Sequence, residues 1–359
     1  MLQAQKPPSQ SASAIVEVDY NRSSVRQLFK QYDRIGFIYP KKRQLLAPFW
    51  QKIQDNWNKL LNTQEELLWI FTKEEEQQNH FASICSWQQS NHGLIAQHLV
   101  SSGNPFQSLQ VMLAAQYRAE HHPLAQEIQS SQNWFRPDNR YAYRVFASMY
   151  EKLGAENASL LSFQYLHLPL GKGLPTAVST KYQLEEVKGI DSAFVNFVSG
   201  RYGQVFTTAE ELDQEDIQLR KIGATYAKYG LSRSRRIFKL SNAQGQVMAA
   251  VVANRAPLGL NFSYLENRAY YILDSELGLD QRIELVQLLN AAIQDYYQDF
   301  PLAALPIVTD TETGAVLQAL SARLFRTYIQ SIWLRAGFSQ WYDHIASFWE
   351  RIARRTRLD

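Results

Sequence analysis

Apolar and polar positions alternate along the chain in a way that predicts helices first and then a run of strands. Apolar residues recur every three or four positions in Ser23–Tyr32 and Gln44–Leu61, as in amphipathic helices. Between the two, Pro40 and the basic residues after it break the pattern. Three strand-like segments follow, and the polar loops between them favour an antiparallel meander: Leu67–Thr72, Phe81–Trp87 and Gly93–Val100.

The third of these strands leads into a predicted helix that begins at Phe106. Asn104 is a good N-cap residue, and Pro105 suits the first helical position. A second helix is predicted over Tyr141–Leu153 and is stopped by Gly154. The strand Ser159–Pro169 then closes the first half.

The second half repeats this order of elements. It is reached through Leu170–Thr180, which contains glycines and a proline and has little apolar periodicity. Tyr328–Leu334 fits either a strand or a helix. The other predicted helices are Ser192–Val205, Asp216–Tyr229, Gln281–Tyr297, Glu312–Arg323 and Ser339–Arg355, and the strands are Arg236–Leu240, Gln246–Asn254, Asn267–Leu273 and Leu305–Thr309, with a hairpin turn at Asn242–Gly245.

This order predicts an α+β fold with mainly antiparallel sheets flanked by helices, in two halves. A length of 359 residues also suits two domains. The expected division is a mobile N-terminal tail (1–20), a first domain (21–170), a linker (171–188) and a second domain (189–359) that ends in a basic helix.

Composition narrows the class of protein. A chain that is 45 % hydrophobic and 20 % charged is globular over most of its length. Cys85 is the only cysteine, which excludes an intramolecular disulfide and fits a reducing compartment, so we expect a cytoplasmic protein. No run of about 18 apolar residues exists, so we predict no transmembrane helix. A net charge of +3 does not by itself predict nucleic-acid binding.

One short stretch resembles a known family. Met149–Gly154 reads Met-Tyr-Glu-Lys-Leu-Gly, similar to the end of the last core helix in many Gcn5-related N-acetyltransferases (GNAT). The GNAT core is an antiparallel meander whose last strand leads into a helix, followed by strand, helix and strand, as in both halves here. The layout also resembles tandem GNAT-like proteins, which include peptidyl-transfer enzymes that use aminoacyl-tRNA. This resemblance implies two GNAT-like halves, an acyl-CoA donor, an amine acceptor and no metal.

The resemblance also implies site residues. Tyr150 would correspond to the tyrosine that protonates the leaving thiolate, and His98 lies where a base would meet the amine. The alternatives are a tyrosine packed in the core and a structural histidine. The turn that holds the cofactor pyrophosphate corresponds to Ser101, Ser102, Gly103 and Asn104, with one glycine where the family has two. In the second half the corresponding turn has Gly278 between Glu276 and Asp280, whose charges repel phosphate.

The remaining candidates are charged residues and histidines. Arg255, Glu266 and Arg268 flank strands and could line a cleft at the splayed end of the second sheet. Two basic clusters could bind an anion, a nucleotide or a nucleic acid, although solvated loops and a helix end explain them equally: Arg233, Arg235 and Arg236, and Arg351, Arg354, Arg355 and Arg357. His92 and the pair His121-His122 lack metal-site spacing to carboxylates or to Cys85.

Two functions therefore stay open. The first is an acyltransferase of GNAT type, with an acyl-CoA donor and an unknown amine acceptor, either a small molecule or a protein. The second is a non-enzymatic binding or regulatory protein on a duplicated GNAT-like scaffold, which would bind a nucleotide, another anionic ligand or a protein partner.

Overall fold

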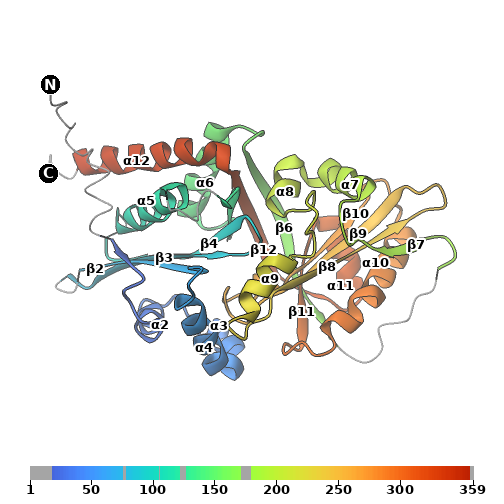
Figure 1. The fold of residues 1–359 in the computed structure, drawn as a ribbon, viewed down its shortest axis with the longest axis horizontal. Coiled ribbons are helices and arrows are strands. Elements are labelled where there is room, and N and C mark those ends of the chain that lie inside the picture. The colour runs from blue at the N-terminus through green and yellow to red at the C-terminus, as the bar shows by residue number, and fades with distance from the viewer. Residues whose placement is uncertain (1–17, 76–77, 105, 122–126, 171–178, 356–359) are drawn as a thin grey trace.

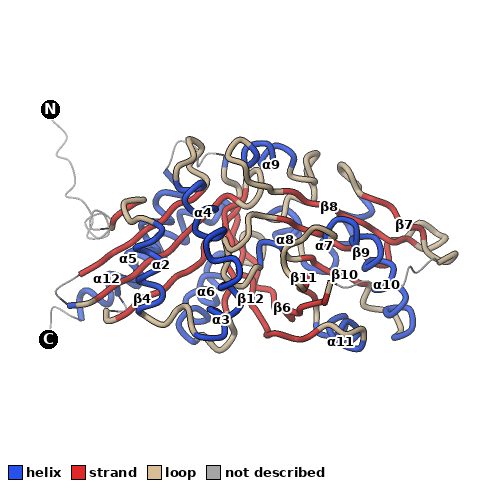
Figure 2. Tube along the Cα trace, turned by 90° about the horizontal axis from the view of Figure 1, so that it is seen from below, coloured by secondary structure: helices blue, strands red, loops and turns tan. Residues whose placement is uncertain are grey.

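A single sheet runs through both halves of the molecule (Figures 1 and 2). The computed structural model describes residues 18–75, 78–104, 106–121, 127–170 and 179–355, with side chains described as far as Arg351. Within these residues the sheet has 12 strands in the order β1-β2-β3-β4-β5-β12-β6-β11-β10-β9-β8-β7. Most of the expected tail, Pro105, His122 and the first part of the linker lie outside the described residues.

The first half follows the predicted order, and the antiparallel meander of β2, β3 and β4 is confirmed. Ser24 caps the first helix by accepting a hydrogen bond from the Gln27 amide. The elements are β1 (Asp19–Tyr20), α2 (Val25–Arg34), α3 (Pro40–Leu46), α4 (Trp50–Leu61), β2 (Leu68–Glu75), β3 (His80–Gln88), β4 (Gly93–Ser102), α5 (Phe106–His121), β5 (Ser130–Phe135), α6 (Arg140–Leu153) and β6 (Ala158–Pro169).

Three details of the first half differ from the prediction. Pro40 begins a helix instead of breaking one, because the first helical position needs no amide hydrogen. Pro48 lies in a 3₁₀ turn, Ala47–Phe49, that splits the predicted helix Gln44–Leu61 in two. The strand β5 was not predicted, because its first four residues are Ser-Ser-Gln-Asn and carry no apolar signal.

The second half contains the same succession of elements. The stretch Tyr328–Leu334 is a strand, and Gly203, with φ of 85°, divides the predicted helix Ser192–Val205. The elements are β7 (Gln183–Glu186), α7 (Ser192–Tyr202), α8 (Gln204–Ala209), α9 (Arg220–Ala227), β8 (Ser234–Ser241), β9 (Val247–Arg255), β10 (Ala269–Leu273), α10 (Leu279–Gln294), β11 (Ala304–Thr309), α11 (Thr311–Ala319), β12 (Arg323–Leu334) and α12 (Phe338–Arg355).

The last strand of each half is exchanged with the other half. β12 lies between β5 and β6, and β6 in turn pairs with β11, so each half completes the sheet of the other. The helix α12 follows β12 across and packs on α5 and α6 (Figure 1). The division into domains at 171–188 remains a prediction, and the exchange joins the two halves through the centre of the sheet.

Helices cover both faces of the first-half sheet. On one face α5, α6 and α12 build a core around Met112, Phe146 and Trp341. On the other face α2, α3 and α4 build a second core around Phe29 and Trp57, which continues into the second half. The helices α10 and α11 cover a third core around Leu285 and Leu317. Among the described helices, none is long and apolar enough to cross a bilayer.

Candidate active-site cleft

The strands β4 and β5 run in parallel only over their first residues. Their pairing extends from Gly93 opposite Ser130 to Ile95 opposite Gln132. Beyond that point β4 contains an irregularity: its register against β3 shifts, and His98 has a positive φ of 56°. A bulge of this kind bends a strand away from its neighbour. The bulge therefore accompanies a separation of β4 from β5.

A cavity of about 360 Å³ lies where the two strands separate. Its walls come from both faces of the sheet, with Tyr141 and Phe146 of α6 on one face and Lys42 of α3 on the other. The remaining walls are β4, β5, β12 and the loop that carries Asn261 and Phe262. A molecule in the cavity can thus contact both faces of the sheet, as two reactants meeting there would require.

His98 lines this cavity, as the sequence placed it, and is electrically neutral. Its side chain is buried, stacks on Trp57 at 5.4 Å between ring centroids, and lies 4.5 Å from Phe262. Burial, followed by the charge of Lys42, holds the pKa of His98 well below its usual value. In the described part of the chain neither ring nitrogen has a hydrogen-bond partner. One nitrogen is therefore free to accept a proton from a ligand.

Other buried polar atoms around the cavity also lack partners among the described residues. They are Nε2 of Gln97, Oδ1 of Asn133 and Nε1 of Trp134. Buried polar groups without partners cost about 1–3 kcal/mol each and are uncommon in folded proteins. Their concentration here indicates a site that binds a polar molecule.

Three cations stand together on the cavity wall: Lys42, Arg136 and Arg326, here called the cationic mouth. Arg326 donates to the Tyr39 hydroxyl at 2.9 Å, and the Lys42 ammonium lies 4.0 Å from the centre of the Phe37 ring. Burial, with the charges of Arg326 and Arg136, lowers the pKa of Lys42 to about 8. None of the described residues lining the cavity is Asp or Glu.

Three tyrosines line the cavity, Tyr39, Tyr141 and Tyr328, whereas the sequence pointed to Tyr150. Tyr150 is half-buried against the core of α5, α6 and α12 and is not part of the cavity wall. Tyr141 lies at the start of the same helix, and its hydroxyl is 2.8 Å from Ser108 Oγ on α5. Tyr141 is 40 % exposed, but partial burial raises its pKa, so its phenol stays protonated at neutral pH.

The expected pyrophosphate turn is partly occupied by the protein itself. Ser101 and Ser102 are the last residues of β4 and pair with β3. Asn104 caps α5 by accepting from the Phe106 amide at 3.0 Å, and the His80 ring fills the space in front of Gly103. The Ser102 hydroxyl is nevertheless buried without a partner in the described chain, as is the whole side-chain amide of Gln107, the second residue of α5.

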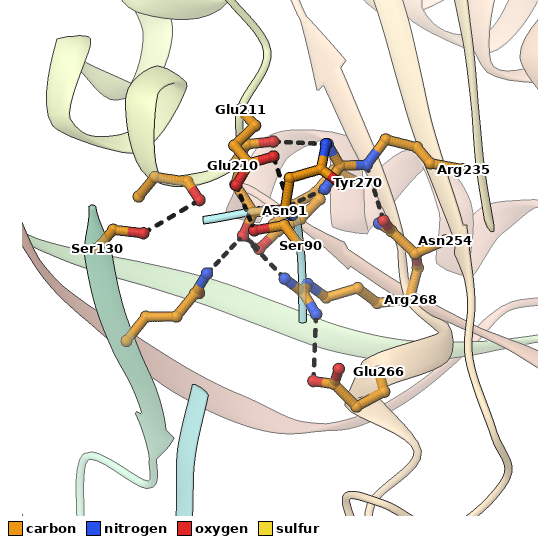
Figure 3. A network of polar contacts seen from close by, with 12 residues as sticks. Ser90, Asn91, Ser130, Glu210, Glu211, Arg235, Asn254, Glu266, Arg268 and Tyr270 are labelled. Atoms are coloured by element: carbon orange, nitrogen blue, oxygen red, sulfur yellow. Dashed lines mark hydrogen bonds and ion pairs between the residues drawn. The ribbon is translucent and has the colours of Figure 1, made fainter. Parts of the chain in front are cut away.

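Glu266 and Arg268 lie in a buried ionic network at the junction of the halves (Figure 3). Arg268 pairs with Glu210 at 2.8 Å, and Glu266 pairs with Arg233 at 3.0 Å. The expectation that these residues line an open cleft does not fit this burial. The expected surface cluster of arginines is also wrong, because Arg233 and Arg235 are buried and Arg236 pairs with Glu186 at 2.7 Å.

Glu210 is the centre of this network and joins both halves. Its carboxylate accepts from Arg235 and Arg268, from the Tyr270 hydroxyl, and from the amides of Gln132 on β5 and Gln330 on β12. Burial alone would raise the pKa of Glu210, but the two guanidinium groups outweigh it and hold the pKa below its usual value. The neighbouring Glu211 accepts from the Ser90 hydroxyl at 2.8 Å and from the Asn91 amide at 3.1 Å in the β3–β4 hairpin.

The other predicted contacts are dispersed. Arg255 pairs with Asp299 at 2.8 Å and lies outside the cavity wall. Gly278 caps α10, and its amide donates to the Gln281 side chain at 3.1 Å. Arg351 donates to the Ser347 carbonyl at 3.1 Å, whereas the side chains of Arg354, Arg355 and Arg357 lie outside the described residues. No group of three or more potential metal ligands occurs in the described residues.

The order of elements along the chain and the order of strands in the sheet together identify the fold. Each half has a meander whose third strand leads into a helix, a strand parallel to it, a helix and a last strand. The fold is GNAT-like. No protein-family model matches the chain, and no curated protein matches it either.

Several solved structures match this chain at a distance. A Drosophila protein is 12 % identical, with 89 % of this chain and 99 % of that chain covered and a TM-score of 0.44. A GCN5-related N-acetyltransferase from Sphaerobacter thermophilus is 10 % identical, with 72 % of this chain and 81 % of that chain covered and a TM-score of 0.33. Saccharomyces cerevisiae N-myristoyltransferase, solved with myristoyl-CoA, is 10 % identical, with 88 % of this chain and 79 % of that chain covered and a TM-score of 0.36. Any function of this chain has to be argued from its own cleft.

Proposed function

We propose that this protein is an N-acyltransferase that transfers the acyl group of acyl-CoA to an amine in the cleft between β4 and β5. The observation that carries the proposal is His98, a neutral, buried histidine on the wall of a cavity that reaches both faces of the sheet, whose ring nitrogens have no partner among the described residues. A base of this kind, positioned beside the reacting atoms, typically contributes about 10²–10⁴-fold to the rate of a reaction.

Groups in the cleft can accept and supply the protons that the transfer requires. The amine nitrogen attacks the thioester carbonyl carbon, the new C–N bond forms, and the C–S bond breaks. His98 takes the proton that the amine loses. The leaving thiolate takes a proton from the Tyr141 phenol, which burial keeps protonated. Solvent exchange then returns both side chains to their starting states.

The donor would be held on the side of the sheet where α5 and α6 lie. A helix N-terminus attracts phosphate through its amide groups and its dipole. At the start of α5 the unpartnered Ser102 hydroxyl and Gln107 amide add hydrogen-bonding groups that a polar ligand can use. The residues of this turn therefore fit an anionic donor in chemistry, although only one glycine is present.

The first test is whether acyl-CoA binds. We expect acetyl-CoA or a longer acyl-CoA to raise the melting temperature of the intact protein, because a ligand at 100 times its Kd stabilises the folded state by about 2.7 kcal/mol. The second test is transfer to amines by wild type and by His98→Asn, since Asn tolerates the positive φ of this position. The variant should lose at least about 100-fold in rate.

His167→Asn is the matched control, because His167 is also kept neutral by burial but is not part of the cavity wall. It should retain the wild-type rate. If no acyl-CoA changes the melting temperature, the acyltransferase proposal is wrong. If both histidine variants keep the full transfer rate, His98 is not the base.

One observation favours a second candidate, an anion-binding protein without transfer activity. The His80 ring and the Asn104 cap occupy part of the turn where an acyl-CoA pyrophosphate would lie. This candidate predicts that nucleotides or other anions stabilise the protein and that acyl-CoA does not. Acyl transfer that is lost in His98→Asn would exclude it.

A further inference from the structure

We propose that the acceptor is a small molecule with a primary amine and an anionic group, carboxylate or phosphate, and that Lys42, Arg136 and Arg326 hold the anionic group. The proposal deepens the proposed function, since it concerns the same cleft and names the acceptor class. It rests on the distribution of charge and of unpartnered polar atoms around the cavity.

The positive charge of the cationic mouth exceeds the negative charge of the side chains close to it. Among the described residues, the acidic side chain paired with this group is Asp138, whose carboxylate lies 3.3 Å from Arg136 Nε, and both Arg136 and Asp138 are largely exposed to water. The Nε atom of Arg326 is buried and without a partner among the described residues. Like charges gathered in a partly buried site repel one another, and a bound anion relieves that repulsion. Two guanidinium groups and an ammonium also match carboxylate or phosphate geometry.

The deeper part of the cavity suits the amine end. His98 and Oδ1 of Asn133 can each accept a hydrogen bond there, and both are more than nine-tenths buried without partners in the described chain. The cavity therefore has acceptors for an amine inside and cations for an anion at its mouth. Its volume of about 360 Å³ is at the small end for ligand sites, which favours a small molecule over a folded protein.

Within the cationic mouth, Lys42 lies on a different side of the sheet from the proposed donor site. Lys42 belongs to α3, whose Leu46 packs in the core of α2 and α4, whereas α5 and α6 build the core on the opposite face (Figure 1). The two anionic groups, one on the donor and one on the acceptor, would therefore bind apart and meet through their reactive ends beside His98.

Calorimetry on the whole protein without acyl-CoA tests the acceptor class. The probes are two matched pairs: 4-aminobutyrate with 4-aminobutanamide, and O-phosphoethanolamine with ethanolamine. In at least one pair the anionic member should bind about tenfold tighter or more, since a charge-assisted hydrogen bond is worth about 1.5–3 kcal/mol. The pair with the larger ratio identifies carboxylate or phosphate. Equal affinities within both pairs, or no binding by any probe, overturn the proposal.

Variants locate the anion. Lys42→Gln and Arg326→Gln should each weaken the anionic probe about tenfold and leave its neutral partner unchanged, whereas Lys42→Arg should restore most of the loss. Lys41→Gln is the matched control on the same helix, because Lys41 does not line the cavity. A loss in Lys41→Gln equal to that in Lys42→Gln overturns the assignment. Because no donor is present, a protein that binds these probes but transfers no acyl group would keep this site and lose only the proposed function.

Discussion

The two halves repeat one order of elements but differ where their parallel strands meet. In the first half β4 has 10 residues, a bulge at His98 and unpartnered polar atoms beside a cavity. In the second half β10 has 5 residues, and the Thr309 hydroxyl on β11 donates to the Tyr271 carbonyl on β10 at 2.7 Å, which links the two strands. The Tyr271 hydroxyl in turn donates to Asn290 at 2.5 Å.

The comparison shows two uses of buried polar groups. In the second half Glu210 pairs with its arginines and joins the halves. In the first half several residues that line the cavity have buried polar atoms with no partner among the described residues, which costs stability unless a ligand binds. The same topology thus supports a structural junction in one place and a candidate site in the other.

The largest expected effect is on the junction. Glu210→Gln removes the charge that two buried guanidinium groups share, so we expect the free energy of unfolding to fall by about 3–5 kcal/mol, measured by urea denaturation. Glu215→Gln, at an exposed position in the same segment, should change it by less than about 0.5 kcal/mol. Equal stability of the two variants would mean that the network does not hold the halves together.

A smaller effect separates Tyr141 from Tyr150, both on α6. If Tyr141 protonates the thiolate, Tyr141→Phe should lower kcat by about 10-fold or more, and Tyr150→Phe should lower it less. Tyr143→Phe serves as a control, since Tyr143 is exposed on the same helix and does not line the cavity. The opposite ranking of Tyr141 and Tyr150 would restore the role that the sequence gave to Tyr150.

We expect the charged form of Lys42 to lower the free energy of unfolding when no ligand is bound. Its pKa of about 8 lies below the usual value of a lysine, because burial and the charges of Arg326 and Arg136 oppose its protonation. His98 and Tyr39 are the other titratable groups beside it. The folded protein therefore binds fewer protons here than the unfolded chain, and stability rises with pH between about 8 and 10.

Lys42→Met should accordingly be more stable than wild type at pH 7, by on the order of 1 kcal/mol, and the difference should shrink as the pH rises above about 8. Denaturant titrations of both proteins at a series of pH values measure this. If Lys42→Met were less stable than wild type at pH 7, the charges of the cationic mouth would not destabilise the folded protein.

The smallest effect concerns the parallel strands β10 and β11 of the second half, which the Thr309 hydrogen bond links. Thr309→Val should lower the free energy of unfolding by about 0.5–1.5 kcal/mol, because it removes one buried hydrogen bond. Thr311→Val, at an exposed position, is the comparison. Neither change should alter acyl-CoA binding, and a change in Thr309→Val would place part of the site in the second half.

Local patterns predicted the meander and most helices, because alternation and helical spacing depend on neighbouring residues. β5 escaped prediction because its Ser-Ser-Gln-Asn sequence becomes buried through partners such as Glu210, far away in the chain. The strand exchange leaves no local signal. Of the site, the sequence placed His98 on the third strand, whereas Lys42 lies in the basic break between two predicted helices and Arg326 belongs to no predicted element.

Amide hydrogen exchange with and without saturating acetyl-CoA tests the difference between the halves most directly. The account predicts slower exchange in β4, in the first turns of α5 and α6 and in the loop around Asn261, with β10, β11 and the start of α10 unchanged. Protection that appears at β10 and α10 instead, or no protection in either half, would contradict it.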